Sequence, residues 1–308
     1  MSHPAMAGLP LVLGGNVFGW TSKGDDGFAV LDAFYEAGGR MIDTADVYSV
    51  WVPGNKGGES EAMIGEWLES RGVRGEMRIH TKTGMLGGNE LYAPERVLQS
   101  LDASLERLRC DYVDLYYAHR DYDELAIEDI VRAFDGAARS GKARALGASQ
   151  FGSARLAEAL SAAATLGATP FTVLQNEYNV LNRADFGPEL QRLCADHGIA
   201  MLPYYGLAAG YLTGKYRSPD DLKTSARGFR AKDFLERGAT VLAAMDAVAA
   251  ETGASMAAIA LAWLRRQPGI AAPIASARMV EQLGPLIEST RLELSEDQLA
   301  RLTAVGLS

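Results

Sequence analysis

The sequence is poor in cysteine, and its two thiols are far apart in the chain. Cys110 and Cys194 are the only cysteines in 308 residues, and neither belongs to a C-x-x-C pair or lies near a histidine cluster. This usage argues against a disulfide scaffold and against a zinc site, so we expect no metal site. It is consistent with a reducing, cytoplasmic location.

Long apolar runs and clusters of basic residues are also missing. No stretch approaches the roughly 20 apolar residues of a membrane-spanning helix, and residues 1–10 lack the regions of a signal peptide. The net charge is −9, and no run or helix face is basic. We therefore expect no nucleic-acid or membrane partner, and a monomer or weak homo-oligomer. An anionic ligand is still allowed, because local lysines and arginines can outweigh net charge inside a pocket.

Short apolar runs that end in glycine or polar residues alternate with segments of helical periodicity. The composition, 48% hydrophobic and 22% charged, is that of an ordinary globular protein. The pattern predicts strands at 11–16, 40–43, 77–82, 112–118, 143–148, 171–175, 199–204 and 270–274. It predicts helices at 27–37, from 59, from 94, and at 127–138, 153–165, 187–196, 238–251, 255–266, 280–288 and 296–304.

Eight strands in alternation with helices favour a parallel sheet closed into an α/β barrel. A doubly wound open sheet is the alternative, but its dinucleotide fingerprint G-x-G-x-x-G is absent, since Gly14, Gly15 and Gly19 have the wrong spacing. We predict one domain over residues 1–308, a (β/α)8 TIM barrel with a long loop at 205–237 after the seventh strand. Its C-terminal tail, 306–308, is short.

Four polar groups lie at or just past the predicted strand ends. Asp43 ends the second strand and Tyr48 follows it by five residues, while Lys82 and His119 end the third and fourth strands. In a parallel barrel, the carboxyl ends of the strands carry the chemistry. A carboxylate, a phenol, an amine and an imidazole gathered there can form a proton-transfer site.

With these residues placed, the chain resembles an aldo-keto reductase over nearly its whole length. The segments that carry the resemblance are 43–48 (DTADVY), Lys82, 116–120 (YYAHR), 147–151 (GASQF), 175–179 (QNEYN), 204–216 (ending in LTGKY) and 276–283. Each motif is short, but their order and placement at strand ends make the signal specific. The LTGKY segment resembles the branch of bacterial soluble reductases and potassium-channel β-subunits.

The resemblance implies reversible reduction of an aldehyde or ketone by NADPH, with NADH possible but weaker. Tyr48 is then the general acid. Lys82 is expected beside it, where its ammonium favours the phenolate and so lowers the pKa of the phenol. Asp43 holds Lys82 charged and oriented, and His119 bonds the carbonyl oxygen. The cofactor-binding residues implied by the family are Ser149, Gln150, Gln175, Tyr204, Gly206, Leu207, Gly210, Lys215, Ser276, Arg278 and Gln282.

Within that cofactor site, Ser149, Gln150 and Gln175 are expected to bind the nicotinamide carboxamide, and Tyr204 to stack on the ring. Arg278 is expected to grip the 2′-phosphate. The sequence departs from the family pattern at Gln150, Tyr205, Gly206, Pro285 and Leu286, and Arg227 or Arg230 could also reach a phosphate. On the substrate side, loop residues that could line an apolar mouth are Trp20, Trp51, Met85 and Tyr92.

Two other functions are compatible with these residues. A cofactor-binding regulatory or redox-sensing subunit with slow turnover would keep the same four groups. An aldolase or lyase would use Lys82 as a Schiff-base nucleophile, although Asp43 would hold that amine protonated.

Overall fold

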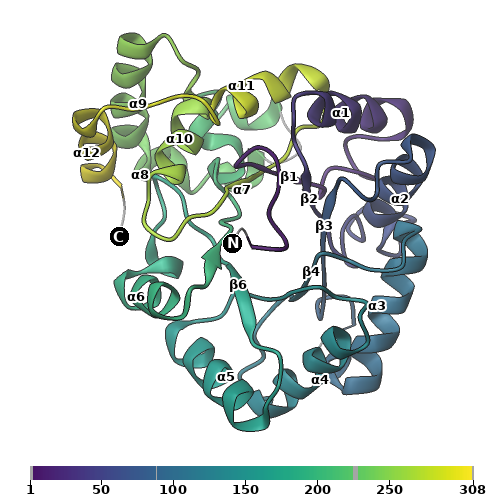
Figure 1. Ribbon diagram of the computed structural model, residues 1–308. Helices are drawn as coiled ribbons and strands as arrows, with labels where there is room; N and C mark the ends of the chain where they lie inside the picture. Colours follow the sequence, from purple (N-terminus) through teal and green to yellow (C-terminus); the bar gives the residue numbers. More distant parts are fainter. Residues whose placement is uncertain (1–2, 88, 225–227, 307–308) are drawn as a thin grey trace.

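A computed structural model describes residues 3–87, 89–224 and 228–306. Its strands form one parallel sheet in the order β7-β6-β5-β4-β3-β2-β1-β8. The strands are β1 (Val12–Gly14), β2 (Met41–Asp43), β3 (Arg78–Thr83), β4 (Leu115–Ala118), β5 (Leu146–Ser149), β6 (Phe171–Gln175), β7 (Ala200–Met201) and β8 (Ile274–Ala275). Figure 1 shows the strands at the centre, with the helices around them.

Backbone contacts between β7 and the chain before β8 bring the two ends of the sheet together. Met201 forms a parallel bridge with Ile270, and the amide of Ile274 donates to the carbonyl of Pro203 at 2.9 Å. The predicted barrel architecture, with eight parallel strands alternating with helices, is confirmed.

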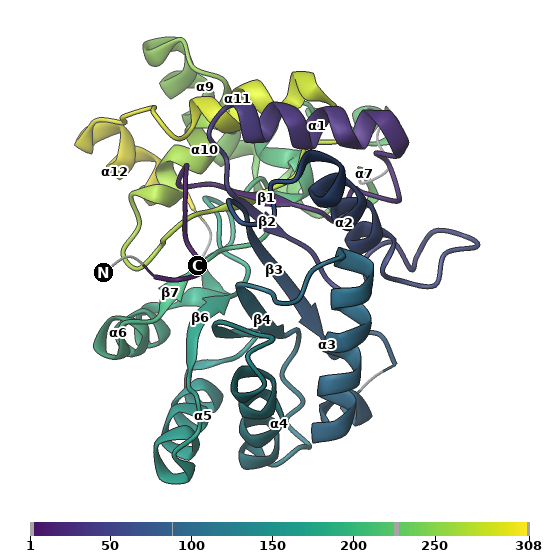
Figure 2. The same ribbon diagram turned by 45° about the vertical axis from the view of Figure 1, so that its right-hand side comes forward.

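The helices follow the strands along the chain and pack around the sheet (Figure 2). They are α1 (Gly24–Glu36), α2 (Glu59–Arg71), α3 (Pro94–Leu108), α4 (Ile127–Arg139), α5 (Ser153–Leu166), α6 (Pro188–His197), α7 (Gly228–Ala231), α8 (Phe234–Arg237), α9 (Ala239–Thr252), α10 (Met256–Arg265), α11 (Leu283–Glu288) and α12 (Glu296–Ala304). Short 3-10 turns are η1 (Asn89–Tyr92), η2 (Ala184–Phe186), η3 (Ala208–Thr213), η4 (Asp221–Thr224) and η5 (Val280–Gln282).

Several strands are shorter than predicted, namely β1, β4, β5 and β7, and two further regions differ in kind. The eighth strand is β8 (Ile274–Ala275), whereas 270–274 was predicted. Residues 270–273 form backbone hydrogen bonds to the chain on both sides, β1 and β7, but not in a regular ladder. Pro273 cannot add to such a ladder, because it has no amide hydrogen. The long loop at 205–237 is also not bare, because it contains η3, η4, α7 and α8.

Strand β3 carries two sets of polar side chains on its opposite faces. Lys82 and His80 belong to the inward set, and the ring of His80 contacts the carbonyl of Ala5, 2.8 Å away in the N-terminal segment. Thr81 and Thr83 point outward toward the helix layer. Because side chains alternate along a strand, β3 supplies both the interior site and the polar layer behind it.

Among the described residues, no single helix is long and apolar enough to cross a membrane. The helices α9 and α10 meet the length and composition test only as a pair bent by 97°.

Gly65 allows α2 and α3 to pack closely. A Cβ atom added there would lie 2.2 Å from the carbonyl oxygen of Arg107 and 2.6 Å from the carbonyl carbon of Leu108. We predict that Gly65→Ala destabilises the protein by about 1–3 kcal/mol, the usual cost of overpacking. Urea unfolding measures the change.

Gly75→Ala is the control, because a Cβ at Gly75 meets no atom within 4 Å. Equal unfolding free energies for the two variants would show that the contact between α2 and α3 yields without strain.

Candidate active site

Lys82 is the centre of the candidate site and is fully buried. Its ammonium donates to Asp43 Oδ2 at 2.5 Å, to the carbonyl of Thr44 at 2.7 Å and to the hydroxyl of Tyr48 at 3.0 Å. Asp43 comes from the end of β2, Lys82 from β3 and Tyr48 from the loop after β2. The ring of His119, just past β4, lies 5.9 Å from that of Tyr48. The four predicted groups are therefore brought together.

The electrostatics fix the protonation states of two of these groups. Burial acts to lower the pKa of Lys82, but the charges of Asp43 and Tyr48 outweigh it and leave that pKa raised. The lysine is therefore an ammonium. Burial, followed by the charge of Lys82, holds the pKa of His119 well below its usual range. The imidazole is therefore neutral near pH 7 and has one N–H to donate.

Gln175 connects the expected carboxamide site to the ion pair. Its Nε2 donates to Asp43 Oδ1 at 2.9 Å across the barrel interior, so Asp43 has a partner on each oxygen. The hydroxyl of Ser149 donates to the carbonyl of Gln175, and Gln150 Nε2 donates to the carbonyl of His119. A ligand bound by these amides would therefore lie beside the proton-transfer groups.

A cavity of about 880 Å³ opens over this site. The predicted residues that line it are Trp20, Asp43, Tyr48, Trp51, Met85, His119, Ser149, Gln150, Gln175, Tyr204, Gly206, Leu207, Gly210, Lys215, Ser276, Arg278 and Gln282. Lys82 is not among them, because it is fully buried and contacts two of the lining residues, Asp43 and Tyr48, from behind.

Tyr92 is the predicted pocket residue that the structure places elsewhere. It is buried away from the cavity, and its hydroxyl donates to the carbonyl of Arg120 at 2.7 Å. Its ring packs against Phe134 and fills the space left by the missing side chain of Gly84. Tyr92 is therefore a core residue that ties together the loops after β3 and β4.

The backbone that begins the segment after β7 is strained. Tyr205, Ala208 and Ala209 have φ values of 55°, 45° and 55°, in the left-handed region that side chains rarely adopt. Non-glycine residues persist in such conformations mainly at functional sites, where the surrounding structure holds them. The side chain of Lys215 folds back over Gly210, since a Cβ at Gly210 would lie 3.1 Å from its Nζ. The backbone of this segment and the ammonium of Lys215 together suit a diphosphate group.

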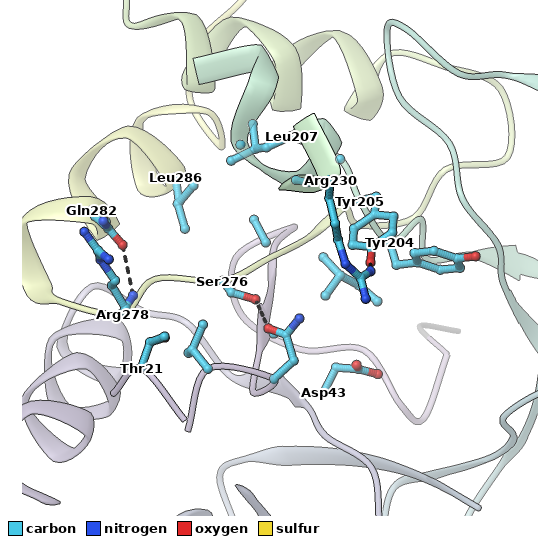
Figure 3. A pocket seen from close by; sticks show the side chains of 18 of the residues that line it. Thr21, Asp43, Tyr204, Tyr205, Leu207, Arg230, Ser276, Arg278, Gln282 and Leu286 are labelled. Carbon is cyan, nitrogen blue, oxygen red and sulfur yellow. Dashed lines mark hydrogen bonds between the residues drawn. The ribbon is translucent and has the colours of Figure 1, made fainter. Parts of the chain in front are cut away.

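The side chains at the far end of the cavity are held by short bonds. Ser276 donates to Asn16 Oδ1 at 2.7 Å, and Gln282 Oε1 accepts from the backbone amide of Arg278 at 3.0 Å (Figure 3). The guanidinium of Arg278 is exposed, and within the described ranges no carboxylate forms an ion pair with it. It can therefore receive a phosphate without breaking an existing pair.

Several lining residues were not identified from the sequence. Asn16 follows Gly14 and Gly15 at the end of β1, and a Cβ at Gly14 would lie 2.5 Å from the hydroxyl of Ser276. That glycine pair was the signal that could have led to Asn16. Phe229 also lines the cavity. Arg230, which was considered for a phosphate, is among the lining residues and donates to the hydroxyl of Tyr205. Arg227, the other arginine considered for a phosphate, lies outside the described residues, as do 307 and 308 of the tail.

The chain is similar to known proteins over nearly its whole length. The model of the Aldo/keto reductase family matches residues 10–306. A norsolorinic acid reductase of Emericella nidulans is 32% identical over 94% of this chain and 76% of its own length. An aryl-alcohol dehydrogenase [NADP(+)] of Phanerodontia chrysosporium is 31% identical over 88% of this chain and 74% of its own. A putative aryl-alcohol dehydrogenase of Saccharomyces cerevisiae is 32% identical over 96% and 82%.

The buried Asp43–Lys82 pair generates a prediction about stability. Lys82→Met leaves the Asp43 carboxylate buried without its cation, which we expect to cost about 3–5 kcal/mol of unfolding free energy. The double variant Asp43→Asn/Lys82→Met removes both charges, and we expect it to recover most of that loss. Chemical denaturation at neutral pH measures both.

The exposed pair Lys142–Asp102, with its atoms 2.5 Å apart, is the control. Lys142→Met should cost less than about 1 kcal/mol. A double variant that is no more stable than Lys82→Met alone would show that the charges do not account for the loss.

Proposed function

The chain belongs to the aldo/keto reductase family, and we propose that it is an NADPH-dependent oxidoreductase that reversibly reduces aldehydes or ketones to alcohols. The observation that carries the proposal is the buried chain of contacts from Asp43 through Lys82 to the hydroxyl of Tyr48, at the floor of the cavity. We also propose that residues 1–308 form one barrel domain that works in the cytoplasm as a monomer or weak homo-oligomer.

The chemistry follows from the charges at the site. The hydride for the carbonyl carbon of the substrate would come from NADPH when that cofactor is bound. Tyr48 gives the proton to the carbonyl oxygen, and the ammonium of Lys82 stabilises the phenolate that remains. The neutral His119 donates a hydrogen bond to the same oxygen and fixes its position. In the reverse direction, the phenolate accepts the proton of the alcohol.

The fit of the cavity to NADPH has three parts. Gln150 and Gln175 carry amides toward the site that the nicotinamide carboxamide would occupy, and Tyr204 lines the same part of the cavity. The strained backbone at 205–210 and Lys215 suit the diphosphate. Arg278 suits the 2′-phosphate, so we propose that NADPH binds more tightly than NADH.

We propose an aromatic carbonyl compound as the substrate. The rings of Trp20 and Trp51 meet edge to face, with their centroids 5.6 Å apart, and Trp51 packs against Tyr48 at 6.2 Å. Met85 lies at the same opening and is also exposed. Aromatic and thioether side chains bind flat rings well. The similar proteins named aryl-alcohol dehydrogenases support the same substrate class.

Two alternatives predict different behaviour. A Schiff-base lyase requires a free amine, whereas Lys82 is charged and already donates three hydrogen bonds. A regulatory subunit of the kind that includes potassium-channel β-subunits, whose branch the segment LTGKY resembles, would bind NADPH but turn over slowly. Turnover with a suitable carbonyl compound separates this second candidate from the reductase.

The test is a fluorescence titration with NADPH, followed by addition of an aromatic aldehyde. We expect tight binding and then oxidation of the bound cofactor. Tyr48→Phe should slow oxidation by about 10²–10⁴-fold, the usual contribution of a positioned acid, and leave NADPH affinity nearly unchanged. Near-normal turnover in this variant would remove Tyr48 from the acid role, and binding without oxidation in the parent protein would favour the regulatory reading.

A second prediction concerns cofactor choice. Arg278→Ala removes a charged partner of the 2′-phosphate, so NADPH affinity should fall by about 10-fold or more while NADH affinity changes little. Titration with both nucleotides measures the ratio. Arg291→Ala, at an exposed arginine that does not line the cavity, is the control. Equal losses for the two nucleotides in Arg278→Ala would show that Arg278 does not read the 2′-phosphate.

A further inference from the structure

Asp46 is a buried carboxyl group for which the proposed reaction has no role. It lies between Asp43 and Tyr48 in the loop after β2, and its side chain is only 3% exposed. It does not line the cavity, so it cannot touch a substrate or cofactor there. Its Oδ1 atom is buried and has no hydrogen-bond partner within the described part of the chain. A carboxyl group in such surroundings needs a physical explanation.

Asp46 fastens the loop that carries Tyr48 to the strand that carries Lys82. The backbone amide of Asp46 donates to the carbonyl of Lys82 at 3.2 Å, and its Oδ2 accepts from the hydroxyl of Thr83 at 2.7 Å. The carbonyl of Thr83 in turn accepts from the amide of His119 at 2.9 Å. One short stretch of β3 therefore sets the positions of Tyr48 and His119 relative to Lys82.

The groups that face Asp46 give it no cation of its own. Glu61 of α2 is the acid whose charge acts on Asp46, and it binds the guanidinium of Arg107 on α3 at 2.6 Å. The other titratable groups around it are phenols, namely Tyr92, Tyr116 and Tyr122. Burial is the largest cause that raises the pKa of Asp46, to about 7, and the charge of Glu61 adds to it. The hydrogen bond from Thr83, the charge of Arg107 and a backbone contact with Val47 act against this rise.

We propose that Asp46 is a positioning residue for proton transfer. Its hydrogen bond with Thr83, called the clip below, fixes the loop and so holds the hydroxyl of Tyr48 on Lys82. The proposal rests on the proposed reductase function. It assigns Asp46 no direct contact with substrate or cofactor, and it distinguishes Asp46 from Asp43, which bonds the ammonium itself.

The charge of the Asp46 carboxyl group depends on pH. Below about pH 7 the carboxyl group is neutral and tolerates its buried, unpaired oxygen. Above that pH the group becomes a buried anion with no ion-pair partner, and its negative charge opposes formation of the Tyr48 phenolate. The sign for stability agrees, because the pKa of the folded state lies above the ordinary Asp value of 3.8. The penalty to stability therefore grows as the pH rises from about 4 to about 7.

The experiment measures kcat and KM for carbonyl reduction between about pH 5 and about pH 9, at saturating NADPH. Asp46→Asn keeps the shape but cannot ionise, so the inflection near neutral pH should disappear. Asp46→Ala and Thr83→Val break the clip, and each should lower kcat by about 10–100-fold, a typical effect of misplacement, with KM and NADPH affinity nearly unchanged.

Thr81→Val is the matched control. Thr81 is also a buried threonine on the outward face of β3 whose hydroxyl donates to a carboxylate, but its partner is Glu61 of α2 and not a residue of the Tyr48 loop. We expect this variant to keep the parent kcat. An Asp46→Asn variant that retains the inflection, or losses in Asp46→Ala that appear in KM or NADPH affinity, would overturn the proposal.

A second measurement does not need turnover. Ultraviolet difference absorbance, with Tyr48→Phe as the reference, follows the ionisation of Tyr48 alone. Thr83→Val should move that titration to higher pH, because the phenol loses its fixed contact with the ammonium while the Asp46 anion remains. If this shift occurs but the parent protein reduces no carbonyl compound, the reductase function fails and the positioning role stands. An active protein without the shift would overturn the positioning role.

Discussion

The ammonium of Lys82 lies in the dry interior of a barrel, and most of the site exists to compensate its charge. A buried charge is tolerated only when it is paired and hydrogen-bonded. Here the carboxylate of Asp43, the carbonyl of Thr44 and the hydroxyl of Tyr48 use its three donors. Gln175 in turn occupies the second oxygen of Asp43. Positions on β2, β3 and β6 are thus tied to one charge, and a change at any of them leaves a buried polar group unpaired.

The alternation of side chains along β3 explains why one strand serves two polar layers. Lys82 faces the interior and takes part in the site, whereas Thr81 and Thr83 face the helices and bond the buried acids Glu61 and Asp46. The outer layer is closed by Arg107 and by the tight contact between α2 and α3 at Gly65. The packing of α2 against α3 is therefore connected to the loop of Tyr48 through this layer of hydrogen-bonded side chains.

Sequence reasoning identified the elements that local pattern determines. Asp43, Lys82 and His119 were placed at strand ends because an apolar run that stops at a polar residue marks such an end. The eighth strand was misplaced, because the run 270–274 is apolar throughout and only tertiary bonds decide which residues join the ladder. Tyr92 was placed at the pocket because loop position alone does not tell which way a ring turns. The partners of Ser276 and Gln175 lie 260 and 132 residues away, beyond any local pattern.

Asp43 and Asp46 show most clearly why the outcome could not be read from the sequence. They lie three residues apart, Asp43 at the end of β2 and Asp46 in the loop that follows, and nothing in the segment DTADVY distinguishes their chemistry. The fold turns Asp43 inward to the ammonium of Lys82 and Asp46 outward to a hydroxyl, beside an acid that already holds the nearby guanidinium. One carboxyl group thus has a cation and the other has none. Environment rather than residue type therefore separates the group that carries the charge from the group that holds the loop.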